Sequence, residues 1–478
     1  MQRTQVSRLE SLPSELFLSI TEYAGFDGRL SLSAANSNCR SLLLQSIFRT
    51  LRVTSDEEEA DEVLKLAKRI GGNVRAIAFH GTAGPNLSEE GKRDEVEDNT
   101  HPSPKTPRDS SIPEQVLPAP AAALLSGAHL PNASTLIVHF AFDFENNDLG
   151  DGIWDSRDDL SDGSSMYVFT VPETNQAMLA ESEAEFPWRR LMSQTWGAAS
   201  QNKNITSLVV GDLIPKAVTS WFDSQWARFL SQLSDADIQL WGGDNGAGWE
   251  VGTLDGYMYF VSQLDRYFLG AMTNVKKLRL SCYEHGPLGS RWTDVEDTMA
   301  LRVRSGCLPR LEELRLEYAA ICPELGEFLV ARGETLRKVA LHECFASREY
   351  RVDEEDVRMT WAELFSALRA ARPTYDSFTV TNDAPPPLTF KEWQRSKDGG
   401  GGGEGKDADD EEESEGVKSV RAEMARHPEK MLFMYATLTD KYGDRWPELD
   451  VIRTHFQAGK DMEEFGKLMR LVGKSGEA

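Results

Sequence analysis

The stretch NVKKLRLS, residues 274–281, carries the pattern that decides the fold of this chain. In this pattern two residues separate the first apolar residue from the second, and one residue separates the second from the third. The three apolar residues here are Val275, Leu278 and Leu280. The last two alternate with polar residues, as on a β-strand that buries one face. Strong copies occur at residues 73–80, 204–211, 310–317 and 335–342, and weaker ones at 134–140, 236–241 and 376–380. The chain is therefore expected to form a series of similar strands.

Apolar residues at helical spacing occupy segments between the copies, at residues 215–234, 257–272 and 323–332. Alternation of strands with helices predicts an α/β fold in which stacked units form a parallel sheet lined by helices. This pattern resembles the leucine-rich repeat in an irregular form, and we expect such a solenoid over residues 71–390. An ordinary doubly wound α/β domain has the same local pattern, but no phosphate-binding turn accompanies any strand.

The composition argues against several classes of partner. The 478 residues include 77 acidic and 52 basic side chains, for a formal net charge of −25, whereas phosphate binding needs clustered Lys and Arg. This length is expected to form several domains or an elongated repeat structure. No apolar run approaches the roughly 18–20 residues that span a membrane, and residues 1–11 lack the apolar core of a signal peptide. We therefore expect no nucleic-acid partner and no membrane partner.

Cysteine usage gives an expectation for the compartment. The cysteines are scattered, odd in number and form no CxxC pair. We expect reduced thiols in a protein of the cytoplasm, the nucleus or both, rather than a disulfide framework or a zinc site. The five residues are Cys39, Cys282, Cys307, Cys322 and Cys344.

Three further segments differ in composition from the repeats. Residues 84–120 are rich in Pro, Ser and charge and too poor in large apolar groups to offset the entropy of ordering, so we expect a disordered insertion. Residues 395–416 contain a run of glycines and then an acidic run, which predicts a flexible linker. Residues 417–478 are expected to form a helical tail punctuated by Pro428 and Pro447.

The N-terminal stretch LPSELFLSI, residues 12–20, is expected to form a helix with two apolar sides. At about 100° per residue, Leu18 points away from one wide apolar face, which is made by Leu12, Leu16, Phe17, Ile20 and Tyr23. Pro13 in the first turn costs no hydrogen bond, and Glu15 lies near the positive end of the helix dipole. A surface helix needs one apolar stripe, so the second stripe predicts a partner.

Residues 12–53 resemble the F-box, the helical module that docks substrate receptors on the Skp-family adaptor of cullin–RING ubiquitin ligases. The residues that carry the resemblance are Leu12, Pro13, Glu15, Leu16, Ile20, Leu30, Leu32, Arg40, Leu42 and the closing IFRTLRV of residues 47–53. That closing stretch is similar to fungal F-box proteins in which it leads into leucine-rich repeats. The chain departs from the family at Arg29, where an acidic residue is usual, and at Ala35 and Cys39, where larger apolar or aromatic residues are common.

The resemblance implies an F-box-like helical module over residues 1–53 of a substrate receptor. Such a receptor would bind the Skp-family adaptor, through it a cullin, and an unidentified protein substrate. The implied adaptor-binding residues are Leu12, Pro13, Glu15, Leu16, Ile20, Leu30, Leu32 and Leu42, the last three serving either as contacts or as core of the helical hairpin. The alternative is an interaction scaffold whose N-terminal helices only cap the repeats.

The sequence contains no catalytic motif that we recognise. Zinc-protease, nucleophile-elbow and phosphate-loop patterns are absent, and the eight histidines are far apart without metal-ligand spacing. We therefore expect neither an enzyme nor a metal or cofactor.

Side chains that alternate with the buried apolar pair are expected on the open face of the sheet. In register, Lys277, Glu313 and Lys338 would lie side by side as a ladder of alternating charge. Such a mixed polar surface suits a protein substrate. The predicted substrate-binding residues are Lys277, Arg279, Glu313, Arg315, Glu317, Lys338 and His342. The alternative is a solvated sheet face with no binding role.

Overall fold

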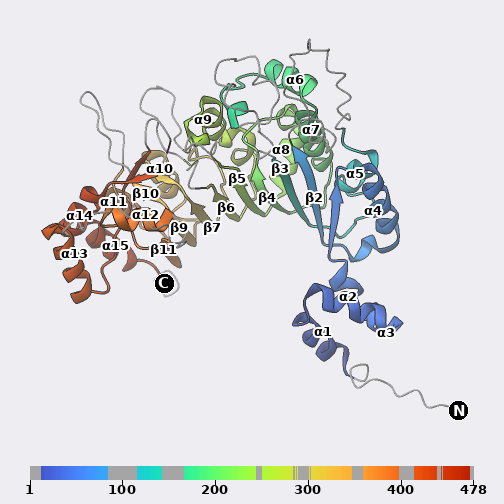
Figure 1. The fold of residues 1–478 in the computed structure, drawn as a ribbon, viewed down its shortest axis with the longest axis horizontal. Helices are drawn as coiled ribbons and strands as arrows, with labels where there is room; N and C mark the ends of the chain where they lie inside the picture. The colour runs from blue at the N-terminus through green and yellow to red at the C-terminus, as the bar shows by residue number, and fades with distance from the viewer. Residues whose placement is uncertain are drawn as a thin grey trace, which may run out of the picture.

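Each copy of the apolar pattern folds into a strand, and successive copies pair in parallel (Figure 1). The computed structural model describes residues 12–83, 116–142, 166–243, 250–283, 286, 288, 301, 303–346, 359–397, 414–438, 443 and 445–473. Within these residues one sheet has nine strands, namely β1 (Thr50–Thr54), β2 (Ala76–Ala83), β3 (Thr135–Phe142), β4 (Ser207–Leu213), β5 (Asp235–Leu240), β6 (Lys277–Ser281), β7 (Glu313–Glu317), β9 (Lys338–His342) and β11 (Ser377–Thr381). The fold is therefore α/β with a large parallel sheet.

The order of the strands distinguishes this sheet from a doubly wound one. The strands follow one another across the sheet in chain order, from β1 at one edge to β11 at the other. A doubly wound sheet instead reverses its strand order at a switch point. The doubly wound alternative is thus wrong. The short strands β8 (Ala320–Ile321) and β10 (Phe345–Ala346) form a separate parallel pair beside β7 and β9.

The register aligns the apolar pattern across the whole sheet. The two apolar residues of each strand fall into two rows, and every member of both rows is buried. The first row is Leu51, Ile77, Leu136, Leu208, Ala236, Leu278, Leu314, Val339 and Phe378, and the second is Val53, Phe79, Val138, Val210, Ile238, Leu280, Leu316, Leu341 and Val380. These rows form the sheet side of one large hydrophobic core.

Helices supply the other side of that core. They are α4 (Glu57–Ile70), α5 (Ala119–Leu125), α6 (Gln176–Glu185), α7 (Pro187–Ala199), α8 (Ser224–Gln232), α9 (Asp255–Ser262), α10 (Pro323–Ala331) and α11 (Trp361–Ala370). Tighter or wider turns join them: η1 (Gly71–Asn73), η4 (Met166–Phe169), η5 (Thr219–Phe222), η6 (Val251–Thr253) and the π-helical η7 (Asp265–Leu269).

A repeated backbone contact joins each unit to the next. The Arg49 carbonyl accepts hydrogen bonds from the N–H groups of Arg75 and Ala76, at 2.8 and 3.0 Å. The same two-donor arrangement recurs before the later strands, and it ends with Arg337, whose carbonyl accepts from Asp376 and Ser377 at 2.7 and 3.1 Å. Successive units are therefore stacked with one shared geometry along the sheet.

The predicted helix over 215–234 is broken in the structure. Residues 219–222 form η5 and α8 begins at Ser224, with Asp223 extended between them. In one continuous helix, Trp221 and Trp226 would point about 140° apart. The break lets both rings enter the core, where their centroids are 6.2 Å apart. The predicted helix over 257–272 is likewise divided into α9 and η7.

Residues 12–47 form a small helical module with a core of its own. Its helices are α1 (Ser14–Glu22), α2 (Gly25–Ala35) and α3 (Ser37–Ile47), which lie below the sheet in Figure 1. Phe17, Cys39, Leu43 and Ile47 are buried together, in a cluster distinct from the large core of the described residues. The departure from the family pattern at Cys39 thus places a small side chain inside this core.

The module ends earlier than the predicted boundary at residue 53. Residues 50–54 form β1, whose Leu51 and Val53 open the two buried rows of the sheet. Residues 57–70, which lie between the predicted module and the predicted start of the repeats at residue 71, form α4. The first unit of the sheet is therefore β1 with α4.

The predicted helical tail also contains strands and packs into the large core. Its described residues form α13 (Glu415–Arg426), α14 (Leu449–Ala458), α15 (Lys460–Met469) and the antiparallel pair β12 (Ala436–Leu438) and β13 (Arg445–Pro447). Phe365 of α11 lies 5.3 Å from Phe433 and 5.2 Å from Phe465, ring centroid to centroid. We call the described residues between 414 and 473 the C-terminal segment, and they cover the last units of the sheet (Figure 1).

Two other predicted boundaries shift. In the predicted insertion 84–120, residues 84–115 lie outside the described residues, whereas Leu117 is buried and α5 begins at Ala119. In the predicted linker 395–416, residues 398–413 lie outside the described residues. Residues 395–397 instead end α12 (Phe390–Lys397), and residues 415–416 begin α13.

Replacement of Leu43 by Ala should loosen the helical module while leaving the sheet intact. Leu43 is fully buried in the small core, and such a truncation costs about 2–5 kcal/mol. Hydrogen exchange followed by mass spectrometry should show faster exchange in residues 14–47 and unchanged exchange in β3 to β7.

Leu278→Ala is the matched control, because Leu278 belongs to the buried rows of the sheet. It should accelerate exchange in β5 to β7 and leave residues 14–47 unchanged. Loosening of both regions by either variant would contradict the presence of two separate cores.

Candidate functional site

The predicted charge ladder forms on the open face of the sheet. Lys277, Glu313 and Lys338 occupy the same register position on β6, β7 and β9. The Nζ atoms of Lys277 and Lys338 lie 3.9 and 3.0 Å from Oε1 of Glu313. Their side chains are partly exposed, so the ladder aligns the strands more than it stabilises them.

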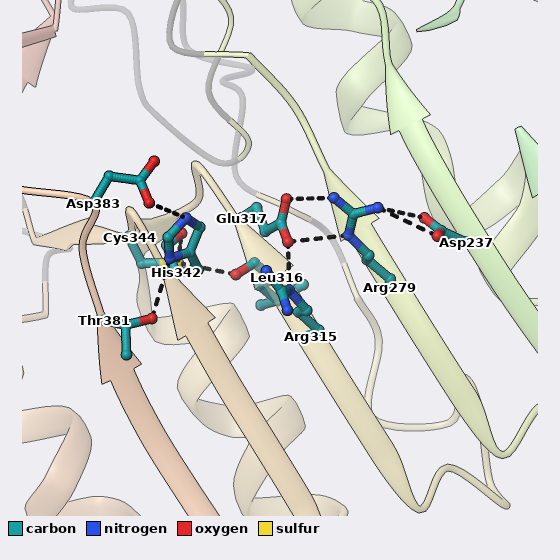
Figure 2. Close-up of polar contacts among 9 residues, drawn as sticks. All are labelled: Asp237, Arg279, Arg315, Leu316, Glu317, His342, Cys344, Thr381 and Asp383. Carbon is teal, nitrogen blue, oxygen red and sulfur yellow. Dashed lines mark hydrogen bonds and ion pairs between the residues drawn. The ribbon is translucent and has the colours of Figure 1, made fainter. Parts of the chain in front are cut away.

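A second and more enclosed ion network lies two residues further along the strands (Figure 2). Nη2 and Nε of Arg279 donate to Oε2 and Oε1 of Glu317 at 2.8 and 3.0 Å. On the other side, Nη1 of Arg279 lies 3.3 Å from Oδ2 of Asp237. Arg315 also donates to Glu317. We call Asp237, Arg279, Arg315 and Glu317 the arginine network.

Asp237 belongs to the arginine network but is not among the residues predicted from the sequence. It lies on β5 directly opposite Arg279, in the weaker copy of the pattern at residues 236–241. The three strongest copies of the pattern predict the ladder, and β5 is not among them. Extending the same register by one strand places Asp237 beside Arg279.

Glu317 stays ionised at the centre of the arginine network. Its side chain is 8% exposed, and this burial opposes the charged form. The hydrogen bonds from Arg279 and Arg315 outweigh the burial and hold the pKa of Glu317 below its ordinary value. The hydrogen bond to Glu317 in turn raises the pKa of Arg279. The network is therefore a fixed set of charges that presents oriented polar groups.

His342 lies at the end of β9, directly opposite Glu317 of the arginine network (Figure 2). Its Nδ1 lies 3.1 Å from Oγ1 of Thr381, and its Nε2 lies 3.4 Å from Oδ1 of Asp383. Asp383 comes from the turn after β11 and was not predicted. It extends the polar surface toward the C-terminal segment.

One register row of the open face is apolar from β2 to β4. Ala78, Ile137 and Val209 share one register row on β2, β3 and β4, and the same row continues to Asp237 and Arg279. Ala78 is buried, and the other two apolar side chains are half-buried. A hollow of about 360 Å³ crosses the face from β4 to β9. The surface thus offers an apolar stretch followed by a charged one.

The helical module has apolar side chains on its exterior. Leu16, Ile20 and Leu30 are 54%, 49% and 47% exposed, and Pro13 and Glu15 are exposed as well. Of the wide face predicted for the first helix, Phe17 points into the small core, whereas Leu16, Ile20 and Tyr23 form an outward stripe at helical spacing.

Leu30, Leu32 and Leu42, which the sequence left as either adaptor contacts or hairpin core, lie in different environments. Leu32 and Leu42 pack against the small core, as does Leu12, whereas Leu30 faces outward. The exposed apolar surface of α1 and α2 is therefore the part of the module that another chain can reach.

Among the residues that the structure describes, no group of three or more His, Cys, Asp or Glu side chains is placed to hold a metal ion. No helix in the same residues is both long enough and apolar enough to cross a membrane. All five cysteines lie in described segments, and each is a buried free thiol.

No family model matches this sequence, and a search of curated proteins returns no match.

Substitution of Glu317 by Gln should destabilise the fold in a pH-dependent way. The charge-assisted bonds from Arg279 and Arg315 are lost, at a cost of about 2 kcal/mol at pH 7. Because the folded protein holds the pKa of Glu317 low, its contribution is present above the unfolded pKa and is lost as the pH falls through the folded pKa. Urea unfolding at pH 7 and at pH 4 or below should show the difference from the natural chain shrinking with acidity.

Glu313→Gln is the control, because Glu313 makes its ion pairs at a more exposed position. It should change stability at pH 7 by less than about 1 kcal/mol. An equal loss for Glu317→Gln at both pH values would show that its ionisation does not stabilise the fold.

Proposed function

We propose that this chain is a non-catalytic substrate receptor of a Skp–cullin–F-box ubiquitin ligase. The helical module of residues 12–47 would dock on the Skp-family adaptor, and the open face of the sheet would bind a protein substrate. The observation that carries the proposal is the outward apolar surface of a module that already has its own core.

Exposure of Leu16, Ile20 and Leu30 to water is unfavourable in free energy, and docking on a partner would remove it. Full burial of a Leu or Ile side chain contributes about 1.5–3 kcal/mol. Covering the exposed halves of Leu16, Ile20 and Leu30 would therefore contribute about 2–4 kcal/mol to docking. Pro13 and Glu15, also exposed, lie beside Leu16 at the start of α1. Five of the eight residues that the F-box resemblance assigns to the adaptor lie on this surface, whereas Leu12, Leu32 and Leu42 pack against the small core.

The alternative of a helical cap is less well supported. A cap stabilises a repeat array by sharing its core with the first unit. Here the buried residues of the module cluster with one another, while Leu51 and Val53 of β1 belong to the large core. A module with a separate core is better suited to holding another protein.

The arrangement of the sheet supports a leucine-rich-repeat-like solenoid as the substrate-binding part. Each unit contributes one strand, the strands follow chain order, and the same backbone contact joins successive units. Such stacking leaves an extended open face, which repeat proteins use for binding. On this face the apolar stretch of β2 to β4 and the arginine network would contact the substrate.

A receptor of this kind needs no catalytic groups. By holding the substrate and the ligase together, it raises the effective concentration of a substrate lysine near the ubiquitin that is to be transferred. The chemistry takes place on other subunits. We place the chain in the cytoplasm, the nucleus or both, since the proposed ligase acts there and the cysteines are free thiols.

Capture of a purified Skp-family adaptor by the full chain tests the proposal. Leu16→Glu combined with Ile20→Glu should lower adaptor binding by about a hundredfold or more, because two carboxylates would enter an apolar interface. Both side chains are exposed, so hydrogen exchange in the module core should stay unchanged. Binding is measured by surface plasmon resonance.

Val330→Glu is the matched control, because Val330 is an exposed apolar residue on α10 of the solenoid part. It should bind the adaptor like the natural chain. Failure of the natural chain to capture the adaptor, or equal capture by the double variant, would refute the proposed function.

A further inference from the structure

A pocket of about 580 Å³ lies where the C-terminal segment meets the ends of β7 and β9. Tyr318 and Glu343, which line it, directly follow Glu317 and His342 on the open face of the sheet. The opposite wall comes from the turn after β11, from α12 and from the C-terminal segment. The volume falls in the range of ligand-binding pockets.

Apolar groups form most of the wall. Trp393 is buried, and its ring packs 4.4 Å from that of Trp446, centroid to centroid. Met424 and Met434 contribute flexible thioethers, which adapt to irregular apolar side chains. The prolines of residues 385–387 make the adjoining wall stiff. The pocket is thus suited to a bulky apolar group.

The charged groups Glu343 and Arg445 at the pocket wall are paired with each other and held in place by hydrogen bonds. Nη2 of Arg445 lies 3.2 Å from Oε2 of Glu343, and both side chains are less than a tenth exposed. Nη1 of Arg445 also donates to the Glu343 carbonyl at 3.1 Å, and the Asp383 N–H donates to Oε1 of Glu343 at 2.8 Å. Glu343 has a φ of 50°, a conformation that these contacts hold in place.

Three arginines and three carboxylates line the pocket, and one of these arginines has no ion-pair partner among the described residues. Each lining carboxylate has a cationic or imidazole partner: Glu343 with Arg445, Glu392 with Arg421, and Asp383 with His342. Arg395 of α12 also lines the pocket and is exposed, and it forms no ion pair within the part of the chain that the structure describes. An anionic group next to an apolar one would complement this arrangement.

We propose that the pocket binds a polypeptide that inserts a bulky apolar side chain and places an acidic residue beside it, against Arg395. Tyr318 and Glu343 connect the pocket to the open face, so a chain lying along that face reaches the pocket at the ends of β7 and β9. The inference rests on the proposed function for the identity of the polypeptide as a ligase substrate. Binding of the polypeptide in the pocket does not require the adaptor.

Methyl NMR of the full chain labelled at its methionines tests the pocket directly. The signals of Met424 and Met434 are assigned from single Met→Leu variants and followed during titration with the peptide acetyl-Gly-Phe-Asp-Gly-amide. Both signals should shift and saturate. Acetyl-Gly-Phe-Lys-Gly-amide should bind at least about fivefold more weakly, and acetyl-Gly-Ser-Asp-Gly-amide should cause no shift.

Two variants separate the charged and the apolar parts of the site. Arg395→Gln should weaken the Phe-Asp peptide about three- to tenfold and leave the Phe-Lys peptide unchanged. Ala384→Trp, at an exposed position on the wall, should obstruct the pocket and abolish binding of both peptides. Unchanged signals from other methionines would show that each variant is folded.

Several outcomes would overturn the inference: no shift at millimolar peptide, equal shifts with the Ser-Asp peptide, or equal weakening of both Phe peptides by Arg395→Gln. Binding of N-acetylphenylalanine as tightly as the peptide would assign the pocket to a small molecule instead. Adaptor capture is measured separately, so peptide binding without capture would refute the ligase proposal and leave the pocket assignment standing.

Discussion

The burial of two aligned rows of apolar side chains is the constraint on which the rest of this structure depends. Leu278 and Leu280, or their equivalents, cannot be buried by a single strand without a neighbouring strand and helices packed on the same face. Stacking the units in chain order solves this problem for all of them with the same backbone contact. Because only one face of the sheet packs against the core, the alternating residues on the other face do not have to be apolar.

That freedom explains the chemistry of the open face. Polar side chains on the same face of adjacent parallel strands lie close enough for direct ion pairs. Arg279 pairs in this way with Asp237, which is directly opposite, and with Glu317, which lies two residues further along β7. Enclosure of Glu317 between two guanidinium groups fixes these side chains before any partner arrives. A surface ordered in this way loses little side-chain entropy on binding, which favours specific recognition.

The two ends of the chain relate to the sheet in different ways. The N-terminal module has a small core separate from that of the sheet, and its Leu16, Ile20 and Leu30 side chains are exposed. The C-terminal segment instead joins the large core and is tied to distant residues by specific polar contacts. Nε1 of Trp361 donates to the Met434 carbonyl at 2.9 Å, and Arg445 pairs with Glu343. One end thus leaves apolar side chains exposed, while the other completes the fold and lines a pocket.

The sequence by itself determined the strands, their burial and the charge ladder, because a strand that buries one face has a period of two that is visible locally. The register of Lys277, Glu313 and Lys338 followed from counting along equivalent copies. Tertiary structure decided what depends on residues far apart in the chain. The break between Trp221 and Trp226 arises because both rings enter one core, and the pairing of Glu343 with Arg445 joins residues about a hundred positions apart. No local pattern encodes such contacts, since their energy exists only once the units are stacked.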